Sequence, residues 1–156
     1  MFDIKSFYEA SSVEDAVRAL SADPDSEVIS GGTDVLIRVR EGKDACKGLV
    51  SIHNIPELKG IEMEENGTIL IRPATSFSHI TNDPIIKKHL NMLGEAVDQV
   101  GGPQVRNTAT IGGNICNGAT SADSASTLCT LNAVLTLAGP NGSRDVPITE
   151  FYTGPG

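Results

Sequence analysis

Two pairs of adjacent glycines are the features of this sequence best suited to chemistry. Gly31-Gly32 opens the segment 31–34, and Gly112-Gly113 lies inside the segment 110–114. Glycine has no Cβ, so its backbone can approach a ligand closely and adopt positive φ. A helix that begins after such a turn offers free N–H groups and the positive end of its dipole, which suit a phosphate. Two such segments favour a dinucleotide, whose two phosphates need donors from more than one direction.

Each segment also has a simpler explanation. Taken alone, 31–34 is better explained as a tight strand-to-helix turn that binds nothing. The alternative for 110–114 is a glycine-rich bend where two backbones cross. Thr33 adds a hydroxyl donor to the first segment. Asp34 would repel a pyrophosphate, so we expect its side chain to cap the following helix instead.

A third polar run, 117–124, precedes an expected helix. Asp123 in this run could accept hydrogen bonds from a ribose diol. The alternative is an ordinary helix N-terminal turn capped by one of the polar side chains, and without the glycine segments that alternative is the better one.

The sequence supports no other common active-site chemistry. It has neither a GxGxxG fingerprint after a strand nor a GxxxxGK[ST] phosphate loop. The three histidines do not pair at metal-ligand spacing. The three scattered cysteines do not suit an iron–sulfur cluster. We therefore expect no catalytic residue and no metal on this chain.

Composition limits the partners. The 156 residues carry a formal net charge of -8, which is a poor match for nucleic acid or an anionic membrane. The first residues show no basic region followed by an apolar run, so we expect no secretory signal. An odd number of cysteines does not suit a disulfide framework. These features favour a cytoplasmic protein.

Helical and strand patterns alternate along the chain, which predicts an α+β fold. Helices are expected at 12–20, 35–39, 76–80, 84–90, 92–100 and 122–131, and strands at 27–29 and 48–52. Hairpins are expected about Asn66-Gly67, from 61–64 to 68–72, and about Asn141-Gly142, from 133–137 to 143–146. The stretch 108–118 is expected to be a glycine-rich loop, and 151–156 a turn-rich segment. We expect two α+β lobes, 1–55 and 56–156.

Two longer segments, which contain the glycine pairs, resemble signature segments of a known family. Ser30–Ile37 and Gln104–Gly118 resemble, in order and spacing, the two signature segments of the FAD subunit of the molybdenum hydroxylases, the xanthine dehydrogenase family. The resemblance extends over essentially the whole chain. It implies a PCMH or vanillyl-alcohol-oxidase type of fold, with FAD held noncovalently between two α+β lobes. Members of the family continue into a third lobe, so we expect a fragment ending at residue 156 to fold but to bind FAD weakly.

The resemblance also implies which residues contact the cofactor. One side of the pyrophosphate would be held by Val28, Ile29, Ser30, Gly31, Gly32, Thr33, Asp34 and Val35. The other side would be held by Thr110, Ile111, Gly112, Gly113 and Asn114. Asp123 would contact the ribose or ribityl region, and Val100 occupies a position that lines the flavin pocket.

The function implied by the resemblance is electron transfer. Substrate would be hydroxylated at a molybdopterin cofactor on one partner subunit, and electrons would pass through [2Fe-2S] clusters on a second partner to FAD and then to NAD. The protein would position the flavin, whose redox chemistry belongs to the cofactor. Two alternatives remain open: a self-contained flavin oxidase of the same fold, and a flavin-free domain that keeps the fold for structural or interaction purposes.

Overall fold

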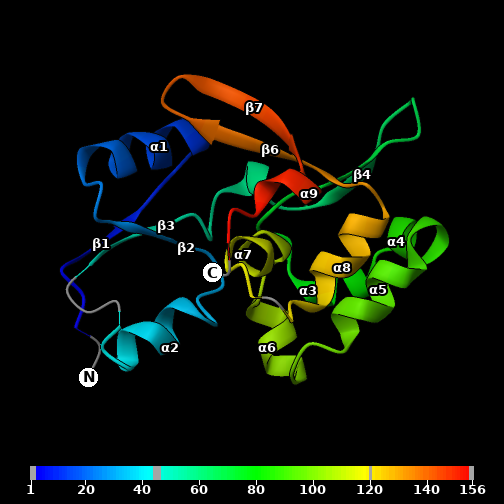
Figure 1. Ribbon diagram of the computed structural model, residues 1–156, viewed down its shortest axis with the longest axis horizontal. Coiled ribbons are helices and arrows are strands. Elements are labelled where there is room, and N and C mark those ends of the chain that lie inside the picture. The colour runs from blue at the N-terminus through cyan, green and yellow to red at the C-terminus, as the bar shows by residue number, and fades with distance from the viewer. Residues whose placement is uncertain (1–2, 44–46, 120, 155–156) are drawn as a thin grey trace.

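The N-terminal part of the chain is a small parallel sheet with two helices (Figure 1). The computed structural model describes residues 3–43, 47–119 and 121–154. The elements in this part are β1 (Ser6–Glu9), α1 (Val13–Ala22), β2 (Glu27–Ile29), α2 (Val35–Arg40) and β3 (Gly48–Ser51). The strand order is β1-β3-β2, so the fully buried β3 lies in the centre. Because the strands are parallel, the loops after β2 and β3 emerge at the same edge of the sheet.

Ser12 fixes the start of α1. Its hydroxyl accepts a hydrogen bond from the N–H of Asp15 at 3.1 Å, as the sequence predicts for an N-cap. The helix packs its apolar side against the sheet, where Ala10, Ala16, Val50 and Ile55 form a buried cluster. This cluster fixes α1 on the central strand β3, which pairs with β2.

The rest of the chain is mainly helical. A short 3-10 helix, η1 (Pro56–Leu58), leads to the hairpin β4 (Ile61–Met63) and β5 (Ile69–Ile71). The helices that follow are α3 (Phe77–Asn82), α4 (Pro84–His89), α5 (Asn91–Asp98), α6 (Pro103–Thr108), α7 (Ile111–Cys116) and α8 (Asp123–Thr130). The described chain closes with the hairpin β6 (Val134–Gly139) and β7 (Gly142–Pro147) and a short helix, α9 (Ile148–Phe151).

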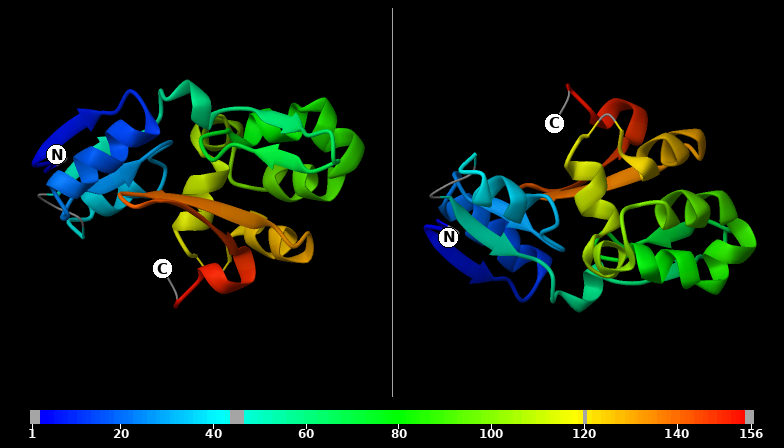
Figure 2. Two further views of the ribbon diagram at one scale, coloured as in Figure 1. Left: turned by 90° about the horizontal axis from the view of Figure 1, so that it is seen from above. Right: turned by 90° about the horizontal axis from the view of Figure 1, so that it is seen from below.

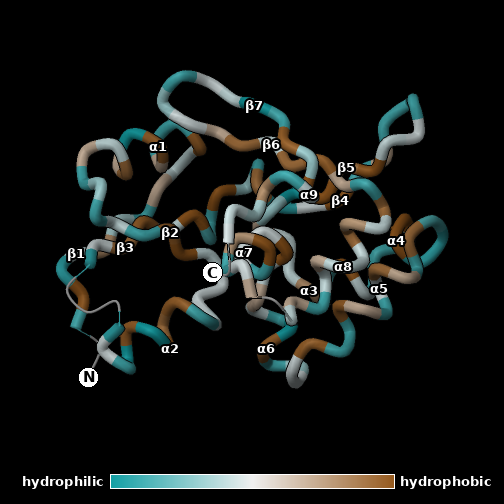
Figure 3. Tube along the Cα trace, viewed as in Figure 1, coloured by the Kyte–Doolittle hydropathy of each residue, from teal (hydrophilic) through white to brown (hydrophobic). Residues whose placement is uncertain are grey.

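The second hydrophobic cluster lies among these helices. Phe77, Ile80, Ile86, Leu93 and Val97 are its fully buried members. Hydrophobic segments of α3, α4 and α5 converge on this region in Figure 3. The mixture of separate sheets and packed helices confirms the α+β class. The proposed division at 55/56 stays a prediction, although the two clusters fall on either side of it.

The hairpin β6-β7 spans the two parts. Strand β6 follows directly from α8, and the hairpin extends across the molecule to contact α1 (Figures 1 and 2). Figure 2 shows α7 lying between the N-terminal sheet and the helical part. The segments that carry the two glycine pairs are therefore brought to the middle of the molecule.

Most predicted elements are present, and one predicted loop is wrong. The stretch 108–118 is not a loop, because 111–116 forms α7. The turn-rich segment expected at 151–156 is present after Phe151, which ends α9, since 153–154 are bends; 155–156 lie outside the described residues. Strand β1 was not predicted at all, since its four residues are exposed and show no alternation. No helix in the described ranges combines the length and apolar character needed to cross a bilayer.

Candidate functional site

The first glycine pair forms a turn whose backbone donors are free. Gly32 has φ +72, a conformation that side chains rarely adopt. The carbonyl of Gly32 accepts from the N–H of Leu36 at 3.0 Å, which turns the chain into α2. Within the described residues, none of the N–H groups of 31–35 donates a hydrogen bond. Such unpaired donors before a helix are suited to an anion.

Two side chains of this turn, those of Asp34 and Ser30, make no hydrogen bond within the described chain. Asp34 occupies the N-cap position of α2, but its side chain makes no capping hydrogen bond, so that prediction is wrong. Its backbone is already helical, with φ -104 and ψ -46, whereas a capping residue is usually extended. The hydroxyl of Ser30 is buried and has no hydrogen-bond partner in the described chain. A buried unpaired hydroxyl beside free N–H groups is a second sign of an external ligand.

Gly31 brings the second signature segment against the first. A Cβ placed on Gly31 would lie 2.0 Å from the carbonyl oxygen of Thr108, at the end of α6. Only glycine permits this contact. The two backbones therefore meet beside a pocket that lies between the turn and α6.

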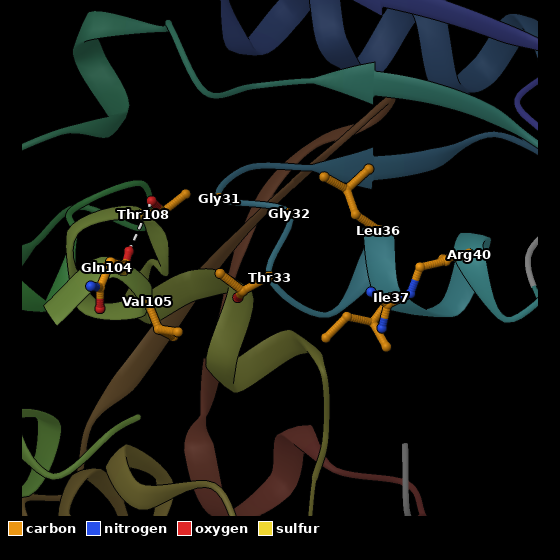
Figure 4. A pocket seen from close by; sticks show the side chains of 9 residues that line it. All are labelled: Gly31, Gly32, Thr33, Leu36, Ile37, Arg40, Gln104, Val105 and Thr108. Carbon is orange, nitrogen blue, oxygen red and sulfur yellow. Dashed lines mark hydrogen bonds between the residues drawn. The ribbon is translucent and has the colours of Figure 1, made fainter. Parts of the chain in front are cut away.

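The pocket has a volume of about 330 Å³. The turn, one face of α2 and the facing side of α6 line it: Gly31, Gly32, Thr33, Leu36, Ile37, Arg40, Gln104, Val105 and Thr108. Figure 4 shows Thr33 facing α6, which carries Val105, with Ile37 and Arg40 further along α2. Thr108 does not point freely into the pocket, since its hydroxyl donates to the carbonyl of Gln104 at 3.2 Å. No carboxylate is among the lining residues, which favours an anionic ligand.

The second glycine pair lies in the first turn of α7, where the backbone donors are already used. The N–H of Ile111 donates to the carbonyl of Thr75 at 3.1 Å, and that of Gly112 to the carbonyl of Pro73 at 2.9 Å. The N–H of Gly113 reaches the hydroxyl of Thr110 at 3.3 Å. This turn can therefore contact a ligand through side chains and close backbone approach, but not through free N–H groups.

Gly112 is needed for packing. A Cβ there would lie 2.6 Å from Cβ of Pro73 and 2.8 Å from its carbonyl oxygen. Gly113 is exposed, and the same addition would meet only the hydroxyl of Thr110, at 3.1 Å. The two adjacent glycines therefore have different reasons to be glycine.

Arg38 ties α2 to the end of α7. Its guanidinium forms an ion pair with Glu27 on β2 and donates to Oδ1 of Asn117 at 3.1 Å. Asn114 is held on the same helix, where its Oδ1 accepts from the hydroxyl of Ser124 at 2.6 Å. The Arg38–Asn117 contact thus links α2 to the second signature segment, and the Ser124–Asn114 contact links that segment to α8.

Asp123 lies apart from the first pocket, in a second hollow of about 440 Å³ between α5 and α8. Ala96 and Gln99 line its α5 side. Val100 follows Gln99 and is half-buried against the helical core. Its carbonyl accepts from Arg106 at 3.2 Å. Asp123 and the neighbour of Val100 thus share one hollow.

The remaining predicted residues serve mainly in the scaffold. Val28 pairs with Val50 in the sheet, and the carbonyl of Ile29 accepts from Ile52 at 2.9 Å. Ile111 is buried in the helical core. Val35 is the first residue of α2.

Sequence reasoning missed Arg40 and the pocket residues of α6. One signal was present, because Thr33, Ile37 and Arg40 recur at helical spacing after the turn. The residues of α6 line the pocket only because of the tertiary contact between Gly31 and Thr108, and no local sequence pattern predicts that contact. Within the described ranges, no three His, Cys, Asp or Glu side chains gather as a metal site.

The comparisons with known proteins identify the family of this chain. Residues 2–156 match the family described as the FAD binding domain in molybdopterin dehydrogenase. The xanthine dehydrogenase FAD-binding subunit of Escherichia coli O157:H7 is 46% identical over 156 residues, covering 100% of this chain and 53% of that protein. The nicotinate dehydrogenase FAD-subunit of Eubacterium barkeri is 37% identical over 129 residues, covering 83% of this chain and 43% of that protein.

Solved structures show the same fold. Carbon monoxide dehydrogenase from Hydrogenophaga pseudoflava superposes with a TM-score of 0.95 at 33% identity, over 99% of this chain and 54% of that one. Quinoline 2-oxidoreductase from Pseudomonas putida 86 gives a TM-score of 0.94 at 26% identity, again over 99% and 54%. The chain belongs to the family of FAD-binding domains of molybdopterin dehydrogenases. It spans about half the length of the curated relatives it matches.

Proposed function

We propose that this chain binds FAD noncovalently, with the pyrophosphate held by the turn 30–35. The observation that carries the proposal is the set of unpaired N–H groups at 31–35, beside the buried unpaired hydroxyl of Ser30. An anion in this position would receive several hydrogen bonds from preformed backbone, and such bonds are stronger when one partner is charged. The absence of acidic residues among those that line the pocket supports the same assignment.

The second signature segment would hold the cofactor from the other side, through different groups. Since the N–H groups of 111–113 already have partners, we propose that Asn114 contributes its amide and that Gly113 permits close approach. Asp123 would accept hydrogen bonds from the ribityl or ribose hydroxyls, and Val100 would lie beside the flavin ring. These last two roles rest on the family resemblance and on the hollow shared by Asp123 and Gln99.

We propose that the larger protein is the FAD subunit of a xanthine dehydrogenase-like molybdenum hydroxylase. Its partners would be a molybdopterin subunit and a [2Fe-2S] subunit, with NAD as the acceptor. The names of the relatives support this assignment, since they include FAD subunits of xanthine and nicotinate dehydrogenases. The turn 30–35 and the segment 110–114 would hold FAD, which would supply the electron- and hydride-transfer chemistry. The residues of this chain would bind and orient it, and none would act as a catalytic acid, base or nucleophile.

A titration of FAD into the full-length subunit tests the binding proposal. Gly32→Ala should weaken FAD binding by about 10-fold, because the turn needs a positive φ at this position to aim its donors. Gly67→Ala is a matched control: it also has positive φ, +87, and nothing lies within 4 Å of an added Cβ. Equal FAD affinity for Gly32→Ala and the control would refute the assignment of the turn.

The partner proposal needs a separate experiment. Purification of the full-length subunit from its native source should recover a molybdenum subunit and an iron–sulfur subunit, and the complex should reduce NAD with its substrate. An active lone subunit would identify a self-contained flavin enzyme. A colourless full-length protein indifferent to FAD would identify a flavin-free domain.

A further inference from the structure

Arg38 forms a bridge between the N-terminal sheet and the end of α7. Its guanidinium pairs with the carboxylate of Glu27 on β2 and donates to Oδ1 of Asn117 at 3.1 Å. Arg38 and Asn117 are 79 positions apart, so the bridge is a tertiary contact. The side chains of Arg38 and Glu27 are only 32% and 24% exposed, and a partly buried pair is screened less by salt than a surface pair.

The chemistry of the bridge requires an arginine. A guanidinium only donates hydrogen bonds, so the amide of Asn117 must turn its oxygen toward α2. The planar guanidinium carries five N–H donors and can serve a carboxylate and an amide at the same time. A lysine has one nitrogen on a flexible stem and holds two partners less well. Glu27 therefore orients Arg38, and Arg38 orients Asn117.

The two ends of α7 are held by different parts of the molecule. At its first turn, the N–H groups of Ile111 and Gly112 donate to backbone carbonyls of the segment 73–75. At its last turn, Asn117 accepts from Arg38, which belongs to the N-terminal part. Figure 2 shows α7 between the two parts. The bridge therefore ties the N-terminal part to a helix that is anchored in the other part.

We propose that Arg38 is a positioning residue, which holds the turn 30–35 and the segment 110–114 at the separation that FAD requires. Arg38 follows the turn on α2, and Asn117 follows the segment 110–114 on α7. Without the bridge, only a fraction of the molecules would have both segments in place, and the apparent affinity would fall by that fraction. This inference rests on the proposed FAD-binding function and adds a residue that acts on binding through Asn117.

Titration of FAD into the full-length subunit tests the bridge with Arg38→Met and Asn117→Ala. Both variants break the same contact, and Asn117→Ala leaves the charge of Arg38 in place. We expect each to weaken FAD binding by about 10-fold, the size expected for a lost hydrogen bond to a charged group. The double variant should lose no more than either single variant, because the two residues act as a pair. Arg38→Lys should recover part of the loss.

Arg72→Met is the matched control. Arg72 also pairs with a glutamate, Glu62, and donates to the carbonyl of Glu57 at 2.9 Å, and its side chain is 34% exposed. Both partners lie at 57–62, outside the N-terminal sheet, so this variant should bind FAD like wild type. The variant Glu27→Gln/Arg38→Met removes the carboxylate that Arg38→Met leaves without its arginine. It should bind FAD as weakly as Arg38→Met, because the bridge is still broken.

Amide hydrogen exchange of the FAD-free full-length subunit gives a reading that does not involve the cofactor. The N–H of Asn117 donates to the carbonyl of Gly113 at 2.9 Å, and that of Gly118 to the carbonyl of Ile115 at 3.2 Å. These amides therefore report on the last turn of α7. Exchange at 117–118 should be faster in Arg38→Met than in wild type and unchanged in Arg72→Met.

Three results would overturn the inference while wild type still binds FAD. They are unchanged exchange at 117–118 in Arg38→Met, wild-type FAD affinity in Asn117→Ala, and losses of the two single variants that add in the double variant. Recovery of FAD affinity in Glu27→Gln/Arg38→Met would also overturn it, since an unpaired carboxylate would then explain the loss. A wild-type subunit that binds no FAD would refute the proposed function itself, and this inference with it.

Discussion

Gly31 and the carbonyl of Thr108 are in such close contact that a single methyl group at Gly31 would lie 2.0 Å from that oxygen. These residues are 77 positions apart in the sequence and come from the two signature segments. Their contact joins the turn 30–35 to α6, and both residues line the pocket. The glycine is therefore required by packing, whatever the turn binds.

Gly31→Ala should destabilise the protein even without FAD. The carbonyl of Thr108 belongs to the backbone and cannot rotate away, so the segments must separate, at a cost of about 1–3 kcal/mol for an overpacked site. Urea unfolding of the FAD-free full-length subunit measures this change. Gly154→Ala is the control, because nothing lies within 4 Å of an added Cβ there. Identical unfolding midpoints for the two variants would contradict the contact.

Thr110 should stabilise α7 through its hydroxyl. The residue is 4% exposed, and its Oγ accepts from the N–H of Gly113. Thr110→Val keeps the shape but removes the cap, so we expect a loss of about 0.5–2 kcal/mol in the free energy of unfolding. Thr110→Ser keeps the acceptor and should lose less. If serine and valine cost the same, the hydroxyl does not cap the helix.

Asp15 should make stability depend on pH. Its carboxylate accepts from the N–H of Ser11, from Arg18 and from the hydroxyl of Tyr8, and these bonds lower its pKa from 3.8 to about 2. Because the folded pKa is below the unfolded one, the unfolded chain takes up the proton first. The stabilisation is complete above pH 3.8 and is lost as the pH falls toward 2.

The measurement is the difference in thermal midpoint between wild type and Asp15→Asn, followed from pH 6 to pH 2. The difference in thermal midpoint should be constant near pH 6 and should shrink at lower pH, as the carboxylate of Asp15 becomes protonated. Glu14→Gln removes a charge from the same helical turn and serves as the control. A difference that stays constant down to pH 2 would show that the charge of Asp15 contributes nothing.

Local signals predicted the elements that depend on local chemistry. Strand β2 and the start of α2 lie where the apolar run and the glycine turn indicate. Ser12 caps α1 by accepting a hydrogen bond from Asp15, only three positions further on. The turn of the first hairpin lies at Asn66-Gly67 because these two residues favour the backbone angles of a tight turn. Each of these depends on neighbours in the sequence.

The errors come from contacts made at a distance. Gly112 indicated a loop, yet it lies in α7 because its small size lets the helix pack on Pro73. Strand β1 has no alternating pattern, and its pairing is supplied by β3. The roles of Arg40 and Val105 in one pocket depend on the meeting of Gly31 with Thr108, which residue patterns cannot specify.

The central claim is that the free N–H groups of 31–35 take up the pyrophosphate of FAD. Amide hydrogen exchange in the full-length subunit, compared with and without FAD, tests it most directly. We predict that FAD slows exchange in peptides that cover 30–36, while peptides of the hairpin β6-β7 exchange equally in both states. Bound FAD with unchanged exchange at 30–36 would contradict the claim, because the cofactor would then be held by other groups.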